Sequence, residues 1–360
     1  MISCWLYPTH LAAETLRILV TGGAGFIGSA LVRDLISKDH QVCTLDKLGY
    51  AGSIKNLDGA YDHPRHSFIE GDIADESVVR EAFSSFEPEA LMHLAAESHV
   101  DRSVDSPRAF IDANIYGTFT LLEAALGAYK ANPEFRMLHV STDEVFGTLG
   151  PTGAFSEESP YRPNSPYSAS KAAADHLARA WYETYGLPVI VTNCSNNYGP
   201  YQHPEKLIPT IIRKALANEP IPVYGDGLQI RDWLHVDDHI RGLVLALTQG
   251  EPGNSYNIGS DNEHTNLDIV ARVLDAVADI DNRDRNALDG LISYVTDRPG
   301  HDRRYAVDAS HIKRSLNWQP EVNFAEGIKS TVAWYATNEA WSQEMAAGSD
   351  GTRLGLRRQV

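Results

Sequence analysis

The chain has 360 residues, with 31 lysines and arginines against 48 aspartates and glutamates, a formal net charge of −17 at pH 7. So acidic a balance argues against a surface that binds nucleic acid or an anionic membrane, and we expect neither as a partner. A hydrophobic content of 43% is ordinary for a folded protein with a real core and excludes wholesale disorder.

The cysteines and the first residues indicate the compartment. Cys4, Cys43 and Cys194 are scattered and form no CxxC pair, which is typical of a reducing compartment and not of a disulfide framework. No run approaches the roughly 18 apolar residues that span a membrane. Residues 1–16 lack the basic start and apolar run of a signal peptide. We therefore expect a cytoplasmic protein with an N-terminal extension over residues 1–16.

Short apolar runs alternate with longer amphipathic runs in the first half of the chain. The predicted strands are residues 17–21, 41–46, 67–70, 90–95, 136–141 and 188–194, and the predicted helices lie near 26–38, 75–85, 107–130 and 166–185. This alternation, with continuously apolar strands, is typical of a parallel sheet covered on both faces. Right-handed crossovers then make a Rossmann-like, doubly wound α/β sheet that binds ligands at the carboxyl ends of its strands.

The regular alternation of strand and helix patterns ends after residue 195. A loop rich in Asn, Pro and Gly follows, and then helix and strand patterns without regular alternation. We expect a Rossmann domain over residues 17–195 that also carries the catalytic residues. Residues 196–338 are expected to form a smaller, mainly substrate-binding α/β lobe. Residues 339–360 are expected to be a C-terminal tail.

A glycine-rich turn joins the first predicted strand to the first predicted helix. Gly22, Gly25 and Gly28 give the GxxGxxG spacing, and glycines here let the backbone approach a pyrophosphate at the helix N-terminus. Asp46 follows 18 residues later, at the end of the second strand, where a carboxylate binds the adenosine ribose and repels a 2′-phosphate. The pattern predicts NAD and not NADP, with Asp72 and Ile73 beside the adenine.

A second constellation lies at the ends of the fifth strand and the helix that follows it. Tyr167 and Lys171 are four residues apart, and therefore one turn apart on one face of a helix. Lys171 supplies the positive charge that a tyrosine, with its ordinary pKa near ~10, needs to act as a base. Thr142 ends the fifth strand at the same edge of the sheet, where it can hydrogen-bond the substrate hydroxyl that Tyr167 deprotonates.

Two adjacent carboxyl groups, Asp143 and Glu144, follow that threonine directly. Transfer of a hydride does not need them, whereas an elimination needs one general base and one general acid. The alternative is a turn with two solvated acids.

Together these motifs resemble the extended short-chain dehydrogenase/reductases over about residues 17–335, and among them the dTDP-glucose 4,6-dehydratase family. The STDEV element discriminates within the group, because related epimerases usually carry small or hydroxylated residues at the two acid positions and GDP-mannose dehydratases resemble TSE. Two residues depart from the usual pattern, Phe146 in place of Tyr and Gly49 in place of Thr. The segments that carry the resemblance are TGGAGFIGS (21–29), AAESHVDRS (95–103), STDEVFG (141–147), YSASKAAAD (167–175), NNYGPYQHPEKLIP (196–209), RDWLHVDDH (231–239) and DRPGHDRRYAVD (297–308).

The resemblance implies conversion of dTDP-glucose to dTDP-4-keto-6-deoxy-glucose and water, as in the biosynthesis of deoxysugars such as dTDP-rhamnose. Tyr167 would take the C4 hydroxyl proton, with Thr142 assisting, while the C4 hydride passes to NAD⁺. Glu144 would remove the C5 proton and Asp143 would protonate the departing C6 hydroxyl, after which the hydride returns to C6. The resemblance also implies a homodimer built through the helices at 107–130 and 166–185.

The same resemblance implies two sets of binding residues, of which Arg231 and Arg298 also suit a diphosphate as planar bidentate donors. The implied cofactor contacts are Gly22, Gly25, Phe26, Ile27, Gly28, Asp46, Lys47, Asp72, Ile73, Ala95, Ala96, Tyr167, Lys171 and Asn197. The implied substrate contacts are Ser98, Thr142, Asn196, Lys206, Leu207, Pro222, Tyr224, Arg231, Asn266, Arg298 and His301.

Other functions stay open at this point. A UDP-glucose 4,6-dehydratase differs in the recognition of a single methyl group on the base, and a nucleotide-sugar 4-epimerase or decarboxylase shares the oxidation half of the reaction. An NAD-binding sensor without catalysis would not need Thr142, Tyr167 and Lys171. His235 and His239 lie one helical turn apart but lack the HExxH pattern, so no metal site is expected.

Overall fold

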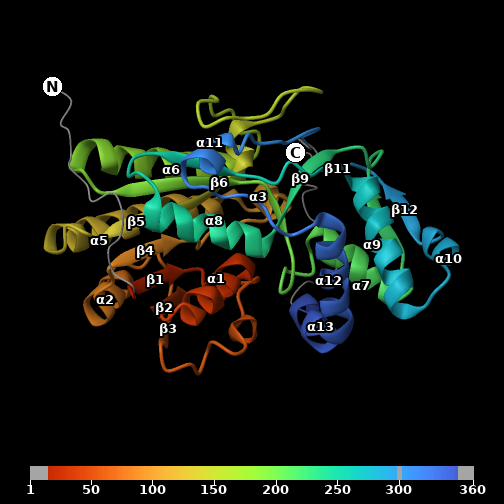
Figure 1. Ribbon diagram of the computed structural model, residues 1–360, viewed down its shortest axis with the longest axis horizontal. Coiled ribbons are helices and arrows are strands. Elements are labelled where there is room, and N and C mark those ends of the chain that lie inside the picture. Colours follow the sequence, from red (N-terminus) through yellow and green to blue (C-terminus); the bar gives the residue numbers. More distant parts are fainter. Residues whose placement is uncertain (1–14, 298–301, 348–360) are drawn as a thin grey trace.

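The main sheet dominates the computed structural model, which describes residues 15–297 and 302–347 (Figure 1). Seven parallel strands lie in the order β10-β6-β5-β4-β1-β2-β3. This order runs outward in both directions from the centre and confirms the Rossmann-like, doubly wound α/β sheet. The strands are β1 (Arg17–Thr21), β2 (Gln41–Asp46), β3 (His66–Glu70), β4 (Ala90–His93), β5 (Arg136–Thr142), β6 (Val189–Cys194) and β10 (Ser255–Ile258).

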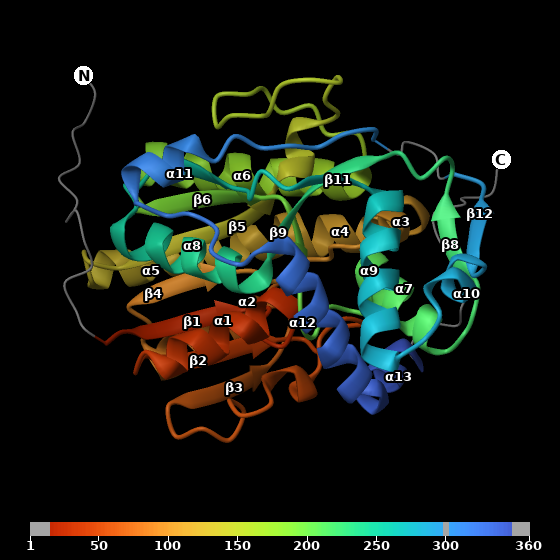
Figure 2. The ribbon, with the colours of Figure 1, turned by 45° about the vertical axis from the view of Figure 1, so that its right-hand side comes forward.

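Helices cover both faces of this sheet (Figure 2). Helices α1 (Phe26–Ser37), α8 (Val236–Gln249) and α11 (Ser310–Ser315) pack on one face, and α2 (Glu76–Phe86), α5 (Gly117–Ala131) and α6 (Pro166–Tyr185) pack on the other. Alternate residues of a strand serve the two faces, as Ile18 and Val20 do on one side and Leu19 on the other. The continuous apolar runs of the sequence therefore reflect burial on both sides.

Helix α6 carries the predicted tyrosine and lysine, and its ends follow from its local sequence. The Ser165 side chain caps the helix by accepting a hydrogen bond from the Ser168 amide at 3.0 Å. Pro166 occupies the first turn, where its missing N–H leaves nothing unsatisfied. Gly186 ends the helix with a φ of 71°, a left-handed conformation that favours glycine.

The helix expected over residues 107–130 contains an irregularity. It runs as α4 (Pro107–Phe110), a π-helical turn (Ile111–Tyr116) and then α5. A π-helical turn inserts one extra residue and is frequent at functional sites. Here it turns the Asn114 side chain into the buried interior, where Asn114 is 1% exposed.

A second lobe lies beside the carboxyl ends of the strands and has its own apolar core. Its two small sheets have the strand orders β11-β9-β7 and β12-β8. Its elements are β7 (Asn196–Tyr198), α7 (Leu207–Leu216), β8 (Ile221–Tyr224), β9 (Ile230–His235), β11 (Glu263–Thr265), α9 (Asn266–Asp281), α10 (Arg285–Asp289), β12 (Ile292–Val295), α12 (Phe324–Thr337) and α13 (Glu339–Ala347).

The structure differs from the expected division of the chain in three places. After residue 195 the chain returns twice to the main sheet, which takes helix α8 and its edge strand β10 from residues 236–258 and helix α11 from Ser310–Ser315. Residues 339–347, expected as part of a tail, form α13, and Trp341 donates to Asn56 Oδ1 at 2.9 Å. These segments bury apolar side chains against distant partners, which the local sequence pattern does not reveal.

Through residues 15–297 and 302–347, no helix has the length and apolar character needed to cross a membrane.

Candidate active site

A cavity of about 330 Å³ lies at the carboxyl ends of the central strands, between the main sheet and the second lobe. It brings together segments that are distant in sequence, among them the glycine-rich turn, the ends of β2, β3 and β4 with the residues that follow them, the end of β5 with helix α6, and residues 194–206. The predicted site residues that line it are Gly22, Gly25, Phe26, Ile27, Gly28, Asp46, Lys47, Asp72, Ile73, Ala95, Ala96, Ser98, Thr142, Asp143, Glu144, Tyr167, Lys171, Asn196, Asn197 and Lys206.

The glycine-rich turn leaves no room for side chains. A Cβ on Gly28 would lie 2.0 Å from the carbonyl oxygen of Gly22, and a Cβ on Gly22 would lie 2.7 Å from the Ala95 nitrogen. Gly22 also has a φ of +72°, which L side chains rarely adopt. The turn is therefore a cradle of bare backbone at the start of α1, and it fits a dinucleotide pyrophosphate.

Asp46 has a structural task besides the predicted one. Its carboxylate accepts hydrogen bonds from the amides of Ala24 and Leu48, both at 2.9 Å. Burial raises the pKa of Asp46, and these two hydrogen bonds oppose the rise. Asp46 thus fixes the shape of the glycine-rich turn while it also lines the cavity.

Lys47, beside Asp46 in the cavity lining, forms ion pairs with two acidic side chains. Its Nζ lies 3.1 Å from Glu97 Oε1 and 3.7 Å from Asp72 Oδ2. The Lys47 charge is therefore already paired, and the surrounding carboxylates make this edge unfavourable for a 2′-phosphate.

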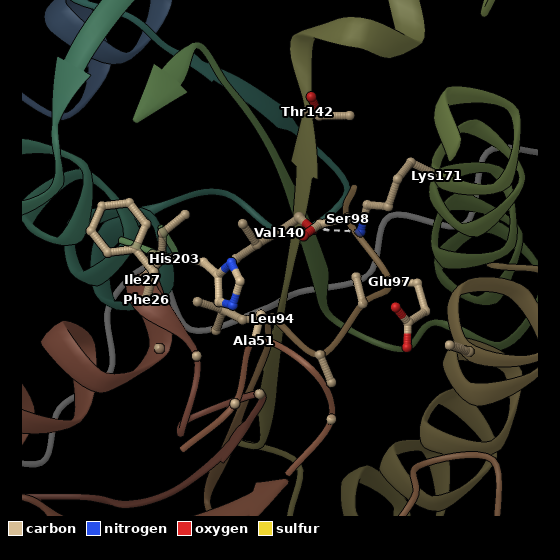
Figure 3. Close-up of a pocket in the computed structure, with 18 of the residues that line it drawn as sticks. Phe26, Ile27, Ala51, Leu94, Glu97, Ser98, Val140, Thr142, Lys171 and His203 are labelled. Atoms are coloured by element: carbon tan, nitrogen blue, oxygen red, sulfur yellow. Dashed lines mark hydrogen bonds between the residues drawn. The ribbon is translucent and has the colours of Figure 1, made fainter. Parts of the chain in front are cut away.

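The tyrosine and lysine of α6 are both buried in the cavity wall. Lys171 Nζ donates to the carbonyl oxygen of Val140 at 2.8 Å, across the cavity from Phe26 and Ile27 (Figure 3). Burial raises the pKa of Tyr167 well above its ordinary value, the Glu144 charge raises it further, and a hydrogen bond with Thr142 lowers it. Thr142 and Tyr167 therefore do meet, as the sequence predicts, and a tyrosine in this setting needs a nearby cation to act as a base.

Asp175, one turn beyond Lys171 on α6, is a buried counter-charge that sequence reasoning missed. Burial lowers the pKa of Lys171, and the Asp175 charge opposes that effect. Asp175 itself accepts hydrogen bonds from Ser141 Oγ at 2.7 Å and Tyr161 OH at 3.0 Å, and its Oδ1 lies 3.0 Å from His139 Nε2. Its position in the YSASKAAAD segment is the only sequence signal for it.

The two adjacent acids have different surroundings. They begin a 3-10 turn (Asp143–Phe146) directly after β5, and Asp143 is 2% exposed whereas Glu144 is half-buried. Burial, and next the Glu144 charge, raise the pKa of Asp143 to about 8. Glu144 Oε2 instead accepts a hydrogen bond from Ser168 Oγ at 3.2 Å. At neutral pH Asp143 is therefore a protonated acid beside the half-buried Glu144.

Several residues of the cavity and its wall were not predicted. Tyr50, Gln202 and His203 line the cavity, and Arg102, which pairs with a loop acid of the second lobe, lies 4.2 Å from the centre of the Tyr50 ring. Asn114, in the π-helical turn, donates to the Glu97 carbonyl and to a serine of α6. Three of these five, Arg102, Gln202 and His203, lie inside the family segments, but no local pattern indicates contacts between positions so far apart.

Phe146, which departs from the usual pattern, packs in a small apolar cluster. Its ring stacks on Phe155 and meets Tyr161 edge-on, both with ring centres 5.2 Å apart. The departure therefore leaves the acids and Tyr167 unchanged.

The predicted substrate residues of the second lobe are only partly brought to the cavity. Arg231 lies near the cavity. The Arg231 charge acts on Asp143, and the Arg231 guanidinium lies 4.4 Å from the centre of the Tyr305 ring. The cavity wall does not include Leu207, Pro222, Tyr224, Arg231 or Asn266. The predicted contacts at Arg298 and His301 lie outside the described residues.

The two histidines of the RDWLHVDDH segment have other partners. His235 caps helix α8, and His239 Nδ1 lies 2.9 Å from Asn197 Oδ1. His239 thereby holds a predicted cofactor residue. In the part of the chain that the structure describes, no three His, Cys, Asp or Glu side chains form a group that could hold a metal ion.

Comparisons with known proteins agree with this site. The family model described as GDP-mannose 4,6 dehydratase matches residues 19–331. The dTDP-glucose 4,6-dehydratase of Xanthomonas campestris pv. campestris is 52% identical over 337 residues, covering 92% of this chain and 96% of that protein. The crystal structure of the dTDP-glucose 4,6-dehydratase of Streptomyces venezuelae, which has NAD bound, is 44% identical with a TM-score of 0.85, covering 91% of this chain and 99% of that one.

An epimerase is similar at a lower level. The Thermus thermophilus UDP-glucose 4-epimerase structure, also with NAD, is 31% identical with a TM-score of 0.79, covering 89% of this chain and 99% of that one. The higher identity to the dehydratases agrees with the Asp143–Glu144 pair at the end of β5. The chain belongs to the dTDP-glucose 4,6-dehydratase family of the extended short-chain dehydrogenase/reductases.

Proposed function

We propose that this protein is an NAD-dependent dTDP-glucose 4,6-dehydratase, which converts dTDP-glucose to dTDP-4-keto-6-deoxy-glucose and water. The observation that carries the proposal is the acid pair: a protonated Asp143 beside Glu144, within the same cavity as Tyr167 and Lys171. Two carboxyl groups whose surroundings separate their protonation are what an elimination requires. The family relationship and the NAD-bound structures of relatives support the same conclusion.

The cofactor fits the residues present. Gly22, Gly25 and Gly28 would hold the pyrophosphate in their bare cradle, and Asp46, which lines the same cavity, would bind the adenosine ribose. The paired Lys47 favours NAD over NADP. When bound, NAD⁺ supplies the hydride acceptor for C4 and the hydride later delivered to C6.

The residues of the chain then have separate tasks. Thr142 and Tyr167 hold the C4 hydroxyl, and Tyr167 accepts its proton, with Lys171 in the same wall to stabilise the phenolate. The resulting 4-ketone acidifies the C5 proton, which Glu144 removes. Asp143 gives its proton to the C6 hydroxyl, so that the C6–O bond breaks and one water leaves. When a hydride is added to C6, C5 takes back a proton from Glu144, so each proton has a donor or an acceptor within one cavity.

Two features of the surface support a homodimer built through α5 and α6. Tyr116 and Tyr185 are 44% and 48% exposed near these helices, and the rings of Phe119 and Trp181 join the two helices edge to face. Burying such aromatic surface is favourable. Sedimentation of a monomer at working concentration would count against this assembly. We further propose that the enzyme acts in the cytoplasm on a step of deoxysugar biosynthesis.

The function is tested by incubating the purified protein with dTDP-glucose and measuring the 4-keto product by its absorbance in alkali. A parallel incubation with UDP-glucose tests the choice of base. Because a methyl contact is worth only ~1–3 kcal/mol, we expect a preference for dTDP-glucose and not an absolute requirement. Production of an epimerised sugar without loss of water would favour the epimerase alternative instead.

A further inference from the structure

The N-terminus of helix α6 does more than present Tyr167, because its first turn also holds a chain of two hydroxyl groups. The Ser168 amide donates to Ser165 Oγ at 3.0 Å, the two serine oxygens are 2.7 Å apart, and Ser168 Oγ donates to Glu144 Oε2 at 3.2 Å. Ser168 is 2% exposed, so water does not readily replace its hydroxyl.

The hydrogen bonds from Ser165 through Ser168 to Glu144 all have the same donor-to-acceptor direction. Since Ser165 Oγ accepts from the Ser168 amide and Ser168 Oγ donates to Glu144, the hydroxyl proton of Ser165 is the one between the two serines. Every proton then points toward the Glu144 carboxylate, and such an acceptor is favoured when it is ionised. The positive end of the helix dipole has the same sign of effect.

Three titratable groups face Glu144, and the Glu144 charge raises the pKa of each of them. Asp143 precedes it on the same turn, Tyr167 faces it from α6, and Tyr305 faces it from the segment after residue 302. Arg231 lies against the Tyr305 ring and acts on Asp143. Asp143 is thus the protonated member of the pair, and Glu144 is the member that accepts a hydrogen bond from the Ser168 hydroxyl.

We propose that Ser168, supported by Ser165, is a positioning residue that holds Glu144 in its ionised form and orients it as the base for the C5 proton. This inference rests on the proposed function, and it adds the reason why two adjacent carboxyl groups take opposite tasks. Asp143 accepts a long hydrogen bond from Thr142 Oγ1, at 3.3 Å, and its burial raises its pKa so that it stays protonated. At Glu144, the next residue, the Ser168 hydroxyl supplies the contrasting environment by donating a hydrogen bond to the carboxylate.

The test is Ser168→Ala, measured in single turnovers with dTDP-glucose in deuterated solvent. Loss of a hydrogen bond to a charged group should slow exchange at C5 roughly 10- to 100-fold. Oxidation at C4, followed by the absorbance of reduced NAD, should slow much less. The acidic limb of the pH profile for C5 exchange should move to higher pH by about one to two units, because a less stabilised carboxylate is protonated sooner.

Companion variants separate this role from packing. Ser165→Ala should give a smaller effect in the same direction, and Ser165→Thr, which keeps the hydroxyl, should restore the exchange rate. Asn323→Ala is the matched control, since Asn323 caps helix α12 in the second lobe by accepting from the Ala325 and Glu326 amides. It should lower thermal stability as Ser165→Ala does, with no change in the pH profile.

The outcomes distinguish the two proposals. If the unmutated protein forms no 4-keto product, the proposed function fails. If it forms the product but Ser168→Ala leaves C5 exchange and its pH profile unchanged, the positioning role alone is overturned. Equal loss of C4 oxidation and C5 exchange in Ser168→Ala would also overturn it, because that result describes a general packing defect.

Discussion

The two walls of the cavity are built on opposite principles. Between β1 and α1 the site consists of missing side chains, because a Cβ at Gly22 or Gly28 would enter its neighbour's backbone. Between β5 and α6 it consists of buried titratable side chains whose protonation depends on their surroundings. The first wall should therefore respond to added volume and hardly to pH, whereas the second should respond to single charges and to pH.

The largest effect is expected from the acid pair of the second wall. Glu144→Gln keeps size but cannot accept the C5 proton, so C4 oxidation should persist while C5 exchange nearly stops. Asp143→Asn cannot donate to the C6 hydroxyl, so it should exchange at C5 yet lose water slowly. Groups of this kind are worth ~10²–10⁴ in rate. Single-turnover exchange and product assays measure both steps, and a common loss of oxidation alone would contradict the assignment.

Added volume should disable the first wall. Gly28→Ala places a Cβ 2.0 Å from the Gly22 carbonyl oxygen, so we expect about 1–3 kcal/mol less stability and weak NAD binding at any pH. Gly127→Ala is the matched control, since a Cβ there meets nothing within 4 Å on helix α5. It should stabilise the protein by about 0.5–1 kcal/mol. Thermal unfolding and titration with NAD measure both variants; intact NAD affinity in Gly28→Ala would refute the cradle.

The pH dependence of water loss should report Asp143. Its pKa is raised to about 8, so it is the protonated donor below that pH, and the rate of water loss should fall about tenfold per pH unit above it. The folded protein also binds this proton more tightly than the unfolded chain, so this contribution to stability is lost as pH rises from about 4 through 8. A pH–rate profile measures this fall in the rate of water loss at high pH, and the fall should be absent in Asp143→Asn. A rate that stays constant through this pH would contradict it.

The smallest effect is expected at Asp46, where the two principles meet. Asp46→Ala removes a ribose acceptor and two hydrogen bonds to the turn, so NAD affinity should fall on the order of 10-fold, as expected for loss of a charge-assisted hydrogen bond. Discrimination against NADP should shrink without reversing, because Lys47 stays paired. Isothermal titration with both cofactors measures this, and equal affinities in the unmutated protein would count against an NAD enzyme.

What the sequence reveals depends on how local each feature is. The strands, the glycine-rich turn, the Tyr167–Lys171 spacing and the acid pair are patterns within a few residues, so all appear where they were predicted. The link between Ser168 and Glu144 lies within two recognised segments, but it depends on the angle at which α6 meets the end of β5. Contacts such as Arg102 with Glu205 join positions 103 residues apart, and no local periodicity encodes them.

The return of residues 236–258 to the main sheet has a mechanical consequence. A lobe joined by one covalent connection can rotate about it, but here the polypeptide leaves the sheet after β6, comes back for α8 and β10, leaves again, and returns once more for α11. Several covalent connections between the main sheet and the second lobe resist rotation of the lobe, because a rotation that relaxes one connection strains another. We therefore expect the two walls of the cavity to keep their spacing throughout turnover.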